Sequence, residues 1–382
     1  MSAKFDLILD LRSGSVGVCA FTKQKKEITP TCLFATRVKI PLQSEFDGNR
    51  GLSDVSLGIK LSLETLRKHI PGHPDSVNVF IGTPWYLSQS RTVIFKGEAP
   101  ITINKKLIDK LLENEVEVFA KEYYRGQKSG ILEKVVMKVA LNGYPTTKPY
   151  GKLAKEIDVT FHLSMTSYDL LDIVRKELGM AYHRKDVVYN TFTFAAWQAA
   201  RATILAGQPD LTFIDIGGEV SEWTLIEGEC LVESISVPIG AHTIVRDIAG
   251  TFHVDLEEAR TLYEAYQEKR VSMVVDKKIS EVLSGVRAKW LTYISGIIQK
   301  MSSTHVIPTR FCVVGVPETA RLFCEALGSP EIQALSVVPG TNVCVLPLSS
   351  DLAQYYQETN PGGPDIFQAF EIIFIDKYVS ML

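Results

Sequence analysis

Two aspartates, each placed after an apolar run and before a glycine-containing turn, carry the clearest chemical signal in this sequence. Asp215 follows the run that begins at Leu211 and precedes Gly217 and Gly218, after which apolar and polar residues alternate. This pattern predicts a β-hairpin with an acid at its rim. Glycines let backbone N–H groups approach an anion, and a neighbouring carboxylate can hold a divalent metal. The stretch therefore predicts a hairpin that binds phosphate and metal.

A second stretch of the same design lies near the N-terminus. An apolar strand reaches Asp10, a turn follows with Ser13 and Gly14, and an apolar strand returns. Two such hairpins indicate an internal duplication, with two similar lobes that face a shared cleft. Asp10 and Asp215 would then hold one Mg²⁺ ion between the lobes.

A third segment extends this interpretation. The stretch FCVVGVPETARLFCEAL reads as a buried strand that ends at Gly315 and continues as a helix. In this order, the three segments resemble the nucleotide-binding motifs of the actin-like ATPase superfamily. The chain is most similar to the bacterial branch that contains the cell-division protein FtsA and the type IV pilus protein PilM. Stretches around Gly240 and Glu258 also resemble segments of these proteins.

The resemblance implies an α/β chain with an actin-like (duplicated ribonuclease H-like) two-lobe fold and an inserted FtsA/PilM-type α+β subdomain. We expect the first lobe in 1–76 and 168–205, the inserted subdomain in 77–167, the second lobe in 206–360, and a C-terminal helix in 361–382 that returns to the first lobe. If nucleotide binding is retained, the resemblance assigns it to Asp10, Ser13, Gly14, Asp215, Gly217, Gly218, Gly240, Glu258 and Gly315.

Several residues depart from the family pattern where glycine lets the backbone touch the nucleotide. Arg12 replaces a glycine in the first hairpin and Glu219 replaces one in the second. A carboxylate at phosphate-contact distance opposes triphosphate binding by on the order of several kcal/mol in a partly buried cleft. The remaining departures from the motif are Val316, Pro317 and Tyr263. The resemblance implies ATP and Mg²⁺ as ligands. Because of these departures, loss of both ligands is the alternative.

The acid that orients the attacking water in the FtsA/PilM pattern is also missing from the corresponding stretch of this sequence. Positions 187–209 contain no acid ahead of Asp210, and Asn190 or Gln198 could position water but could not accept a proton as a general base. We expect no catalytic residue. We further expect Arg12 and Glu219 to occupy matching places on the two hairpins and to form an ion pair across the cleft.

Composition narrows the class of protein. A net charge of −3 gives no basic excess for nucleic acid, and the six cysteines lack metal-ligand spacing, so reduced, buried thiols in a cytoplasmic protein are expected. The final helix carries Glu371 and Asp376, which we interpret as an acidic face that anionic lipid repels. Membrane contact would then be indirect, through partners at the inner face of the cell membrane.

These observations favour a cytoplasmic scaffold of a membrane-associated machine with weak or lost ATPase activity, in type IV pilus assembly or in cell division. Protein partners are expected at the inserted subdomain, around Tyr144, Lys148, Tyr150 and Lys152. One alternative is a slow ATPase whose nucleotide state gates filament assembly. A sugar kinase of the same fold is a more distant alternative.

Overall fold

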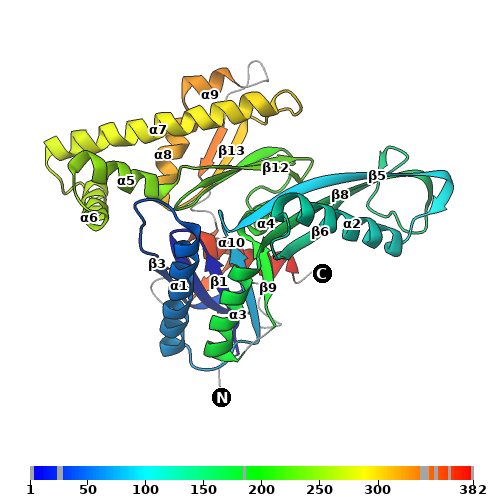
Figure 1. The fold of residues 1–382 in the computed structure, drawn as a ribbon, viewed down its shortest axis with the longest axis horizontal. Helices are drawn as coiled ribbons and strands as arrows, with labels where there is room; N and C mark the ends of the chain where they lie inside the picture. The colour runs from blue at the N-terminus through cyan, green and yellow to red at the C-terminus, as the bar shows by residue number, and fades with distance from the viewer. Residues whose placement is uncertain are drawn as a thin grey trace.

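The structure is a computed structural model that describes residues 4–23, 29–183, 186–335, 344–347, 352–359 and 363–379. Its strands form three separate sheets, and the helices cover these sheets (Figure 1). Two of the sheets belong to the two lobes, and the third belongs to a subdomain that projects to one side. Within the described residues, no helix is both long enough and apolar enough to cross a bilayer.

The first lobe is built on a six-stranded sheet with the order β15-β3-β2-β1-β4-β9. Its strands are β1 (Asp6–Leu11), β2 (Ser15–Thr22), β3 (Thr31–Lys39), β4 (Ser76–Ile81), β9 (Val188–Thr191) and β15 (Gln357–Glu358). Helices α1 (Gly48–His69) and α3 (Tyr168–Tyr182) cover one face, where they share one apolar cluster with β1, β2 and β4. This cluster fixes β1, and with it Asp10, at the centre of the sheet.

The second lobe repeats this arrangement with the order β12-β11-β10-β13-β14. Its strands are β10 (Leu211–Ile216), β11 (Ser221–Glu227), β12 (Cys230–Val237), β13 (Arg310–Val314) and β14 (Cys344–Pro347). In both lobes the first three strands are antiparallel neighbours and the fourth lies parallel to the first. The duplication expected from the two hairpins is therefore confirmed by the sheet topology.

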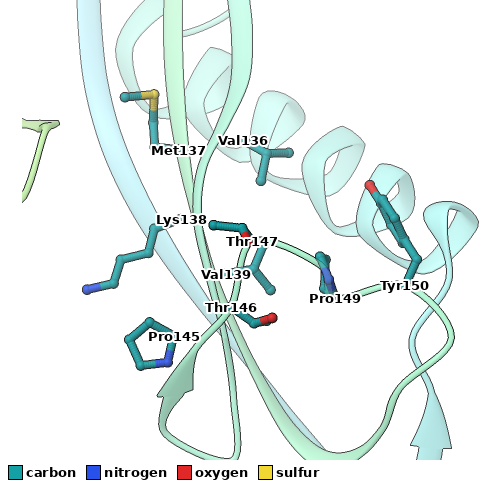
Figure 2. A pocket seen from close by; sticks show the side chains of 9 residues that line it. All are labelled: Val136, Met137, Lys138, Val139, Pro145, Thr146, Thr147, Pro149 and Tyr150. Carbon is teal, nitrogen blue, oxygen red and sulfur yellow. The ribbon is translucent and has the colours of Figure 1, made fainter. Parts of the chain in front are cut away.

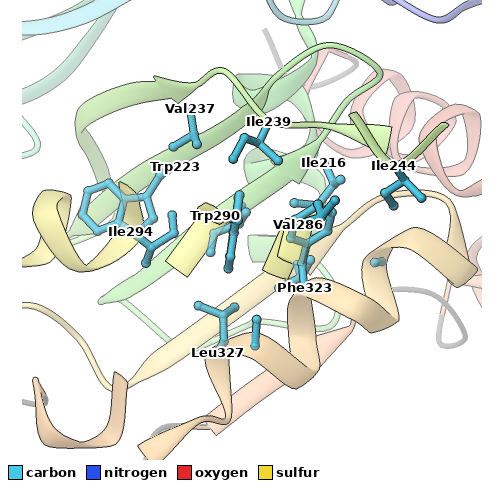
Figure 3. Close-up of a cluster of buried hydrophobic side chains, with 14 of the residues drawn as sticks. Ile216, Trp223, Val237, Ile239, Ile244, Val286, Trp290, Ile294, Phe323 and Leu327 are labelled. Carbon is cyan, nitrogen blue, oxygen red and sulfur yellow. The ribbon is translucent and has the colours of Figure 1, made fainter. Parts of the chain in front are cut away.

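A large apolar core supports the second lobe. It lies under helices α5 (Ala241–Phe252), α6 (Leu256–Gln267), α7 (Met273–Met301), α8 (Pro317–Leu327) and α9 (Pro330–Ala334). Figure 3 shows Trp223 of β11, Trp290 of α7 and Phe323 of α8 in this core. The indole Nε1 of Trp290 donates to Ser221 Oγ at 2.8 Å, so its polar atom is satisfied on the sheet.

A second apolar cluster joins the two lobes. Helices α4 (Phe192–Arg201) and α10 (Ile366–Lys377) pack against Ile8 and Phe80 of the first lobe and against Phe213 and Val314 of the second. Every residue of α10 from Phe367 to Phe374 is buried, so this helix is core, as we expected. The expected acidic face is wrong, because Glu371 and Asp376 are buried as well.

The inserted subdomain has its own four-stranded sheet, with the order β5-β8-β6-β7. It contains β5 (Tyr86–Thr102), α2 (Lys105–Tyr124), β6 (Ser129–Leu141), β7 (Tyr144–Pro145) and β8 (Leu153–Ser167). The expected start at residue 77 needs correction, since β4 pairs with β1 and β9 in the first-lobe sheet. We therefore place the start of the subdomain at Tyr86.

Local pairing and capping set three element boundaries. Residues 188–191 form β9, so α4 begins at Phe192. Helix α1 has Asp47 as its N-cap, which accepts from Arg50 N at 2.8 Å. Helix α7 begins at Met273, where Ser272 caps its first turn.

Candidate functional site

The turns of the two hairpins meet between the lobes. The first turn closes by a hydrogen bond from Arg12 N to Ser15 O, and the second by the equivalent bond from Gly217 N to Val220 O. Across the junction, Glu219 N donates to Ser13 Oγ at 3.0 Å. A Cβ added to Gly218 would lie 3.0 Å from Gly14 N. The glycines assigned to phosphate contact thus let the two hairpins contact each other.

Arg12 connects the two aspartates. Its Nε lies 3.1 Å from Asp10 Oδ2, and its Nη1 lies 3.1 and 3.2 Å from the two carboxylate oxygens of Asp215. The guanidinium also stacks on aromatic rings, with Cζ 3.9 Å from the Phe192 centroid and 3.5 Å from that of Phe367. Arg12 is 4% exposed, so one side chain from the first lobe joins both lobes inside the protein.

A second arginine continues this arrangement. Arg37 on β3 donates from Nη2 to Asp10 Oδ2 at 2.6 Å and from Nε to Asp365 Oδ2 at 2.6 Å. Asp365 is the N-cap of α10 and accepts from Gln368 N at 3.0 Å. The charges therefore alternate along a chain from Asp215 through Arg12, Asp10 and Arg37 to the start of α10.

Along this chain of charges, burial and ion pairing shift the pKa values of the side chains in opposite directions. Burial alone would lower the pKa of Arg12, but the carboxylates of Asp215 and Asp10 outweigh it and raise the pKa. Burial raises the pKa of Asp215 above its usual range, while Arg12 opposes the shift. Burial likewise raises the pKa of Glu371 on α10, with a further increase from nearby Asp10. Neither oxygen of Glu371 has a hydrogen-bond partner among the described residues, which fits a neutral carboxyl.

The two aspartates do not fit a Mg²⁺ site in this arrangement. Mg²⁺ is held by carboxylate and water oxygens in octahedral geometry. Both oxygens of Asp215 accept from Arg12, and Oδ2 of Asp10 accepts from Arg12 and Arg37. Of the four carboxylate oxygens, Asp10 Oδ1 alone has no hydrogen-bond partner among the described residues. The guanidinium already supplies the positive charge between the carboxylates, so this arrangement does not fit the metal.

The expected ion pair between Arg12 and Glu219 is wrong. Glu219 accepts from Arg246 at 2.7 and 2.8 Å and lies 2.8 Å from His242 Nδ1, all within the second lobe. Burial raises the pKa of Glu219, but hydrogen bonds from His242 and Arg246 outweigh it and lower the pKa. The hydrogen bonds of the turns also show that Arg12 corresponds to Gly217, not to Glu219. The two residues therefore have different surroundings.

The N-terminus of α5 is occupied by the second hairpin. Ala241 N donates to Gly217 O at 3.0 Å, and His242 N donates to Gly218 O at 2.8 Å. A Cβ on Gly240 would lie 2.4 Å from Gly218 O. Gly240 is thus required for contact between the helix and the hairpin, and the helix amides that could hold a phosphate are used inside the protein.

A pocket of about 250 Å³ remains above the hairpins. Tyr263 and Val316, two departures from the family motif, line it together with Gly14, Gly217 and Gly218. Gly315 and Pro317 lie beside it, where Gly315 packs against Ile216 and Pro317 begins α8. Glu258 is exposed on the first turn of α6 and is not among the residues that line this pocket.

A buried acid near this site, Glu222, was not predicted from the sequence. Glu222 on β11 accepts from Tyr86 Oη and from Thr193 Oγ1. Burial raises the pKa of Glu222 to about 7. Asn190 lies in β9 and Gln198 in α4, and both are buried. Strand alternation around Trp223 places Glu222 on one face of the strand, but no local pattern indicates that both faces of β11 are covered.

The expected partner surface lies at the outer end of the inserted subdomain. Asn142 and Gly143 form its tight turn with φ values of 50° and 82°, a left-handed pair typical of two-residue hairpins. Tyr144 is 78% exposed and Tyr150 is 56% exposed. Lys148 and Lys152 are exposed in the same loop.

Comparisons with known proteins support the fold. The sequence matches no protein-family model and no curated protein. Among solved structures, a chain of the PilM-PilN type IV pilus biogenesis complex aligns over 96% of this chain and 97% of its own, with 13% identity and a TM-score of 0.66. The ethanolamine utilization protein EutJ from Carboxydothermus hydrogenoformans covers 98% of this chain and 90% of its own, with 12% identity and a TM-score of 0.45.

A third similar structure is a Bacteroides thetaiotaomicron protein described as having an actin-like ATPase fold and unknown function. It covers 97% of this chain and 96% of its own, with 8% identity and a TM-score of 0.43. At these identities a likeness shows the fold alone. The fold is the actin-like two-lobe fold, in the arrangement seen in the PilM-PilN complex.

Proposed function

We propose that this actin-like protein of PilM type is a scaffold that assembles with protein partners in a type IV pilus complex and does not turn over ATP. The observation that carries the proposal is the position of Arg12, whose guanidinium pairs with Asp10 and Asp215 together. Those two carboxylates are the ones that the resemblance assigns to the metal. With both occupied by Arg12, the hairpins are joined without a nucleotide.

The geometry around the turns supports the loss of turnover. Phosphoryl transfer depends on groups that cradle the phosphates and on a metal that neutralises the developing charge. Here Gly14 and Gly218 contact each other, and the amides of Ala241 and His242 donate to hairpin carbonyls. Accommodating a triphosphate would require these contacts to separate.

The pilus role ranks ahead of a division role because of the structural likeness to a chain of the PilM-PilN complex. In this proposal the protein is cytoplasmic and reaches the inner face of the cell membrane only through partners. The working surface is the inserted subdomain, around Tyr144 and Tyr150, because large aromatic side chains exposed together are typical of interaction surfaces. Filament formation by the protein itself stays a separate prediction, which electron microscopy of concentrated protein would test.

A slow ATPase remains the second candidate, and one observation favours it. The pocket above the hairpins stays open and is lined by Gly217, Gly218 and Tyr263, next to the strand end at Gly315. A nucleotide could enter there if Arg12 moved away from the aspartates. Its binding would then open the junction between the hairpins and act as a switch for assembly.

Thermal unfolding with and without ATP and Mg²⁺ separates the two candidates. Ligand at a hundredfold excess over its Kd adds about 2.7 kcal/mol of stability, a clear shift of the melting temperature. The scaffold predicts unchanged melting at millimolar ATP and Mg²⁺. A shift that Asp215→Asn abolishes, but that the exposed control Asp109→Asn on α2 retains, would overturn the scaffold and establish the switch.

A further inference from the structure

The inserted sheet ends in a strand whose outer edge is largely unpaired. In the order β5-β8-β6-β7, β7 pairs with β6 only at Ala140 and Leu141. One further bond runs from Thr146 N to Val139 O. From Ser129 to Lys138, no strand in the described part of the chain pairs with this side of β6. An open edge of this kind is a template for a further strand.

A groove of about 690 Å³ lies along this edge. One wall is β6 from Val136 to Val139, and the opposite wall is Pro145 of β7 and the loop that follows it, with Pro149 and Tyr150. Figure 2 shows Tyr150 and Pro149 on the loop opposite Val136. The edge is therefore not covered by its own loop, and it borders a space large enough to hold side chains from another chain.

The side chains of the groove have a defined character. Val136, Val139, Pro149 and Tyr150 supply apolar surface, and Lys138 is the one charged residue among those that line the groove. Alternating positions of a bound strand would point toward and away from such a wall. An apolar residue at every second position of the partner fits this groove.

Charge identifies the kind of partner. Lys134 and Lys138 lie along β6, and Lys148 lies in the facing loop; each is exposed, and none has an ion pair among the described residues. Elsewhere in the subdomain, Lys96 pairs with Glu156 at 2.8 Å, while other lysines, such as Lys105 on α2, are exposed. The open edge of β6 and the loop that faces it thus both carry positive charge.

The same lysines exclude one occupant. Like charges along an edge strand keep copies of a protein from pairing edge to edge. A second copy of β6 that paired antiparallel about Val136 would bring Lys134 opposite Lys138 of the other copy. An acidic strand would instead neutralise them.

We propose that the edge of β6 between Lys134 and Lys138 binds an extended, acidic segment of a partner protein, which adds to the inserted sheet as an outer strand. The backbone N–H and C=O groups of the edge supply hydrogen bonds, and the groove selects alternating apolar residues. Lys138 and Lys148 select carboxylates over cationic side chains. This inference rests on the proposed scaffold function and assigns the chemistry of its partner.

Binding of a labelled peptide to the whole protein tests the proposal. The probe alternates valine and glutamate; one control alternates valine and lysine, and another carries methyl groups on alternate backbone nitrogens of the acidic peptide. Fluorescence anisotropy should show saturable binding of the acidic probe only. Equal binding of all three peptides, or no binding of the acidic probe at about 1 mM, would overturn the proposal.

Variants of two lysines locate the binding. Lys138→Glu should weaken the acidic probe by at least about tenfold, while Lys105→Glu on the exposed face of α2 should leave it unchanged. Bound probe should also slow hydrogen exchange at the amides of Lys134 to Lys138. Unchanged exchange there, or equal effects of the two variants, would place the peptide elsewhere and contradict strand addition.

The outcome is separable from that of the scaffold proposal. Peptide binding together with an ATP-dependent melting shift would leave the edge site standing and overturn the scaffold. No peptide binding together with unchanged melting would leave the scaffold standing and remove β6 as its docking strand.

Discussion

Nη1 of Arg12 lies 3.1 Å from Oδ1 of Asp215, and this contact joins two hairpins that are far apart in the sequence. Two nitrogens of one guanidinium, Nε and Nη1, reach the two carboxylates, whereas a metal between them would need water and phosphate to complete its coordination shell. Because Arg12 is part of the chain, the two lobes are held together without a nucleotide. The stability of the closed form should therefore depend on Arg12 directly.

Replacing Arg12 by methionine should destabilise the protein strongly. The change keeps apolar volume between Phe192 and Phe367 but leaves Asp10 and Asp215 buried with less positive charge. Breaking a buried ion pair by removing one partner costs roughly 3–5 kcal/mol. Chemical denaturation should show a loss of this size. Lys39→Met, which removes the exposed pair with Glu264, should cost no more than about 1 kcal/mol.

A double-mutant cycle distinguishes pairing from packing. Asp215→Asn removes the charge that Arg12 neutralises across the lobes, so the double variant should lose less stability than the sum of the two single losses. Additive losses would mean that Arg12 acts through its stacking on the rings alone.

The contact of Gly240 with the second hairpin gives a steric prediction. Alanine at this position would place its Cβ 2.4 Å from Gly218 O and 2.6 Å from Gly217 O, both backbone atoms. Overpacking of this kind costs roughly 1–3 kcal/mol. Gly250 lies in the same helix with no atom within 4 Å of an added Cβ. Gly250→Ala should instead stabilise the protein by about 0.5–1 kcal/mol, and equal effects in denaturation would contradict the steric reason.

Buried glutamates predict a dependence of stability on pH. Burial raises the pKa of Glu222 to about 7 and that of Glu133 to about 7. The folded protein then binds more protons than the unfolded chain between about pH 4.5 and 7, so the free energy of unfolding should fall as pH rises through this window. Each shift corresponds to roughly 3 kcal/mol.

Glu222→Gln should flatten this dependence, because glutamine keeps a neutral side chain near Tyr86 and Thr193 at every pH. Urea denaturation at several pH values between 5 and 7 measures the slope. Glu113→Gln, on the exposed face of α2, should leave the slope as it is in the original protein. A slope that Glu222→Gln does not change would assign the pH dependence to other groups.

The cysteines should differ in reactivity. Cys344 is exposed, whereas Cys19, Cys32 and Cys312 are buried. Burial raises the pKa of Cys312 to about 12, which lowers its thiolate fraction further. A thiol reagent should modify Cys344 first in the native protein, and Cys344→Ser should remove the fast phase. A fast phase that persists in this variant would show that another thiol opens to solvent.

Local sequence was sufficient for the two hairpins, because a tight turn and strand alternation depend on near neighbours. The repeated topology of the lobes followed from recognising the two turns as copies. The C-terminal helix was correctly predicted as core, because apolar residues recur along Ile366–Lys377.

Other parts of the site depend on distant contacts that no local pattern encodes. The pairing of Arg37 with Asp365 spans 328 positions, and the burial of Glu371 follows from the lobes enclosing α10 on all sides. The start of the insertion was misplaced because an apolar strand such as β4 suits either sheet. The pairing of Glu219 was misassigned because the partners His242 and Arg246 enter from a helix whose angle the sequence does not specify.

The way the inserted subdomain is attached has one more consequence. Its first and last strands run side by side, and Tyr86 at the entry lies directly opposite Thr166 at the exit. Cross-strand neighbours are about 5 Å apart, so the chain leaves the first lobe and comes back at nearly the same point. The insertion is thus attached to the first lobe through two neighbouring strands, β5 and β8. Excising it would leave ends that a short linker can rejoin. Exchange of this module between related scaffolds could change the partner while the two lobes keep their shape.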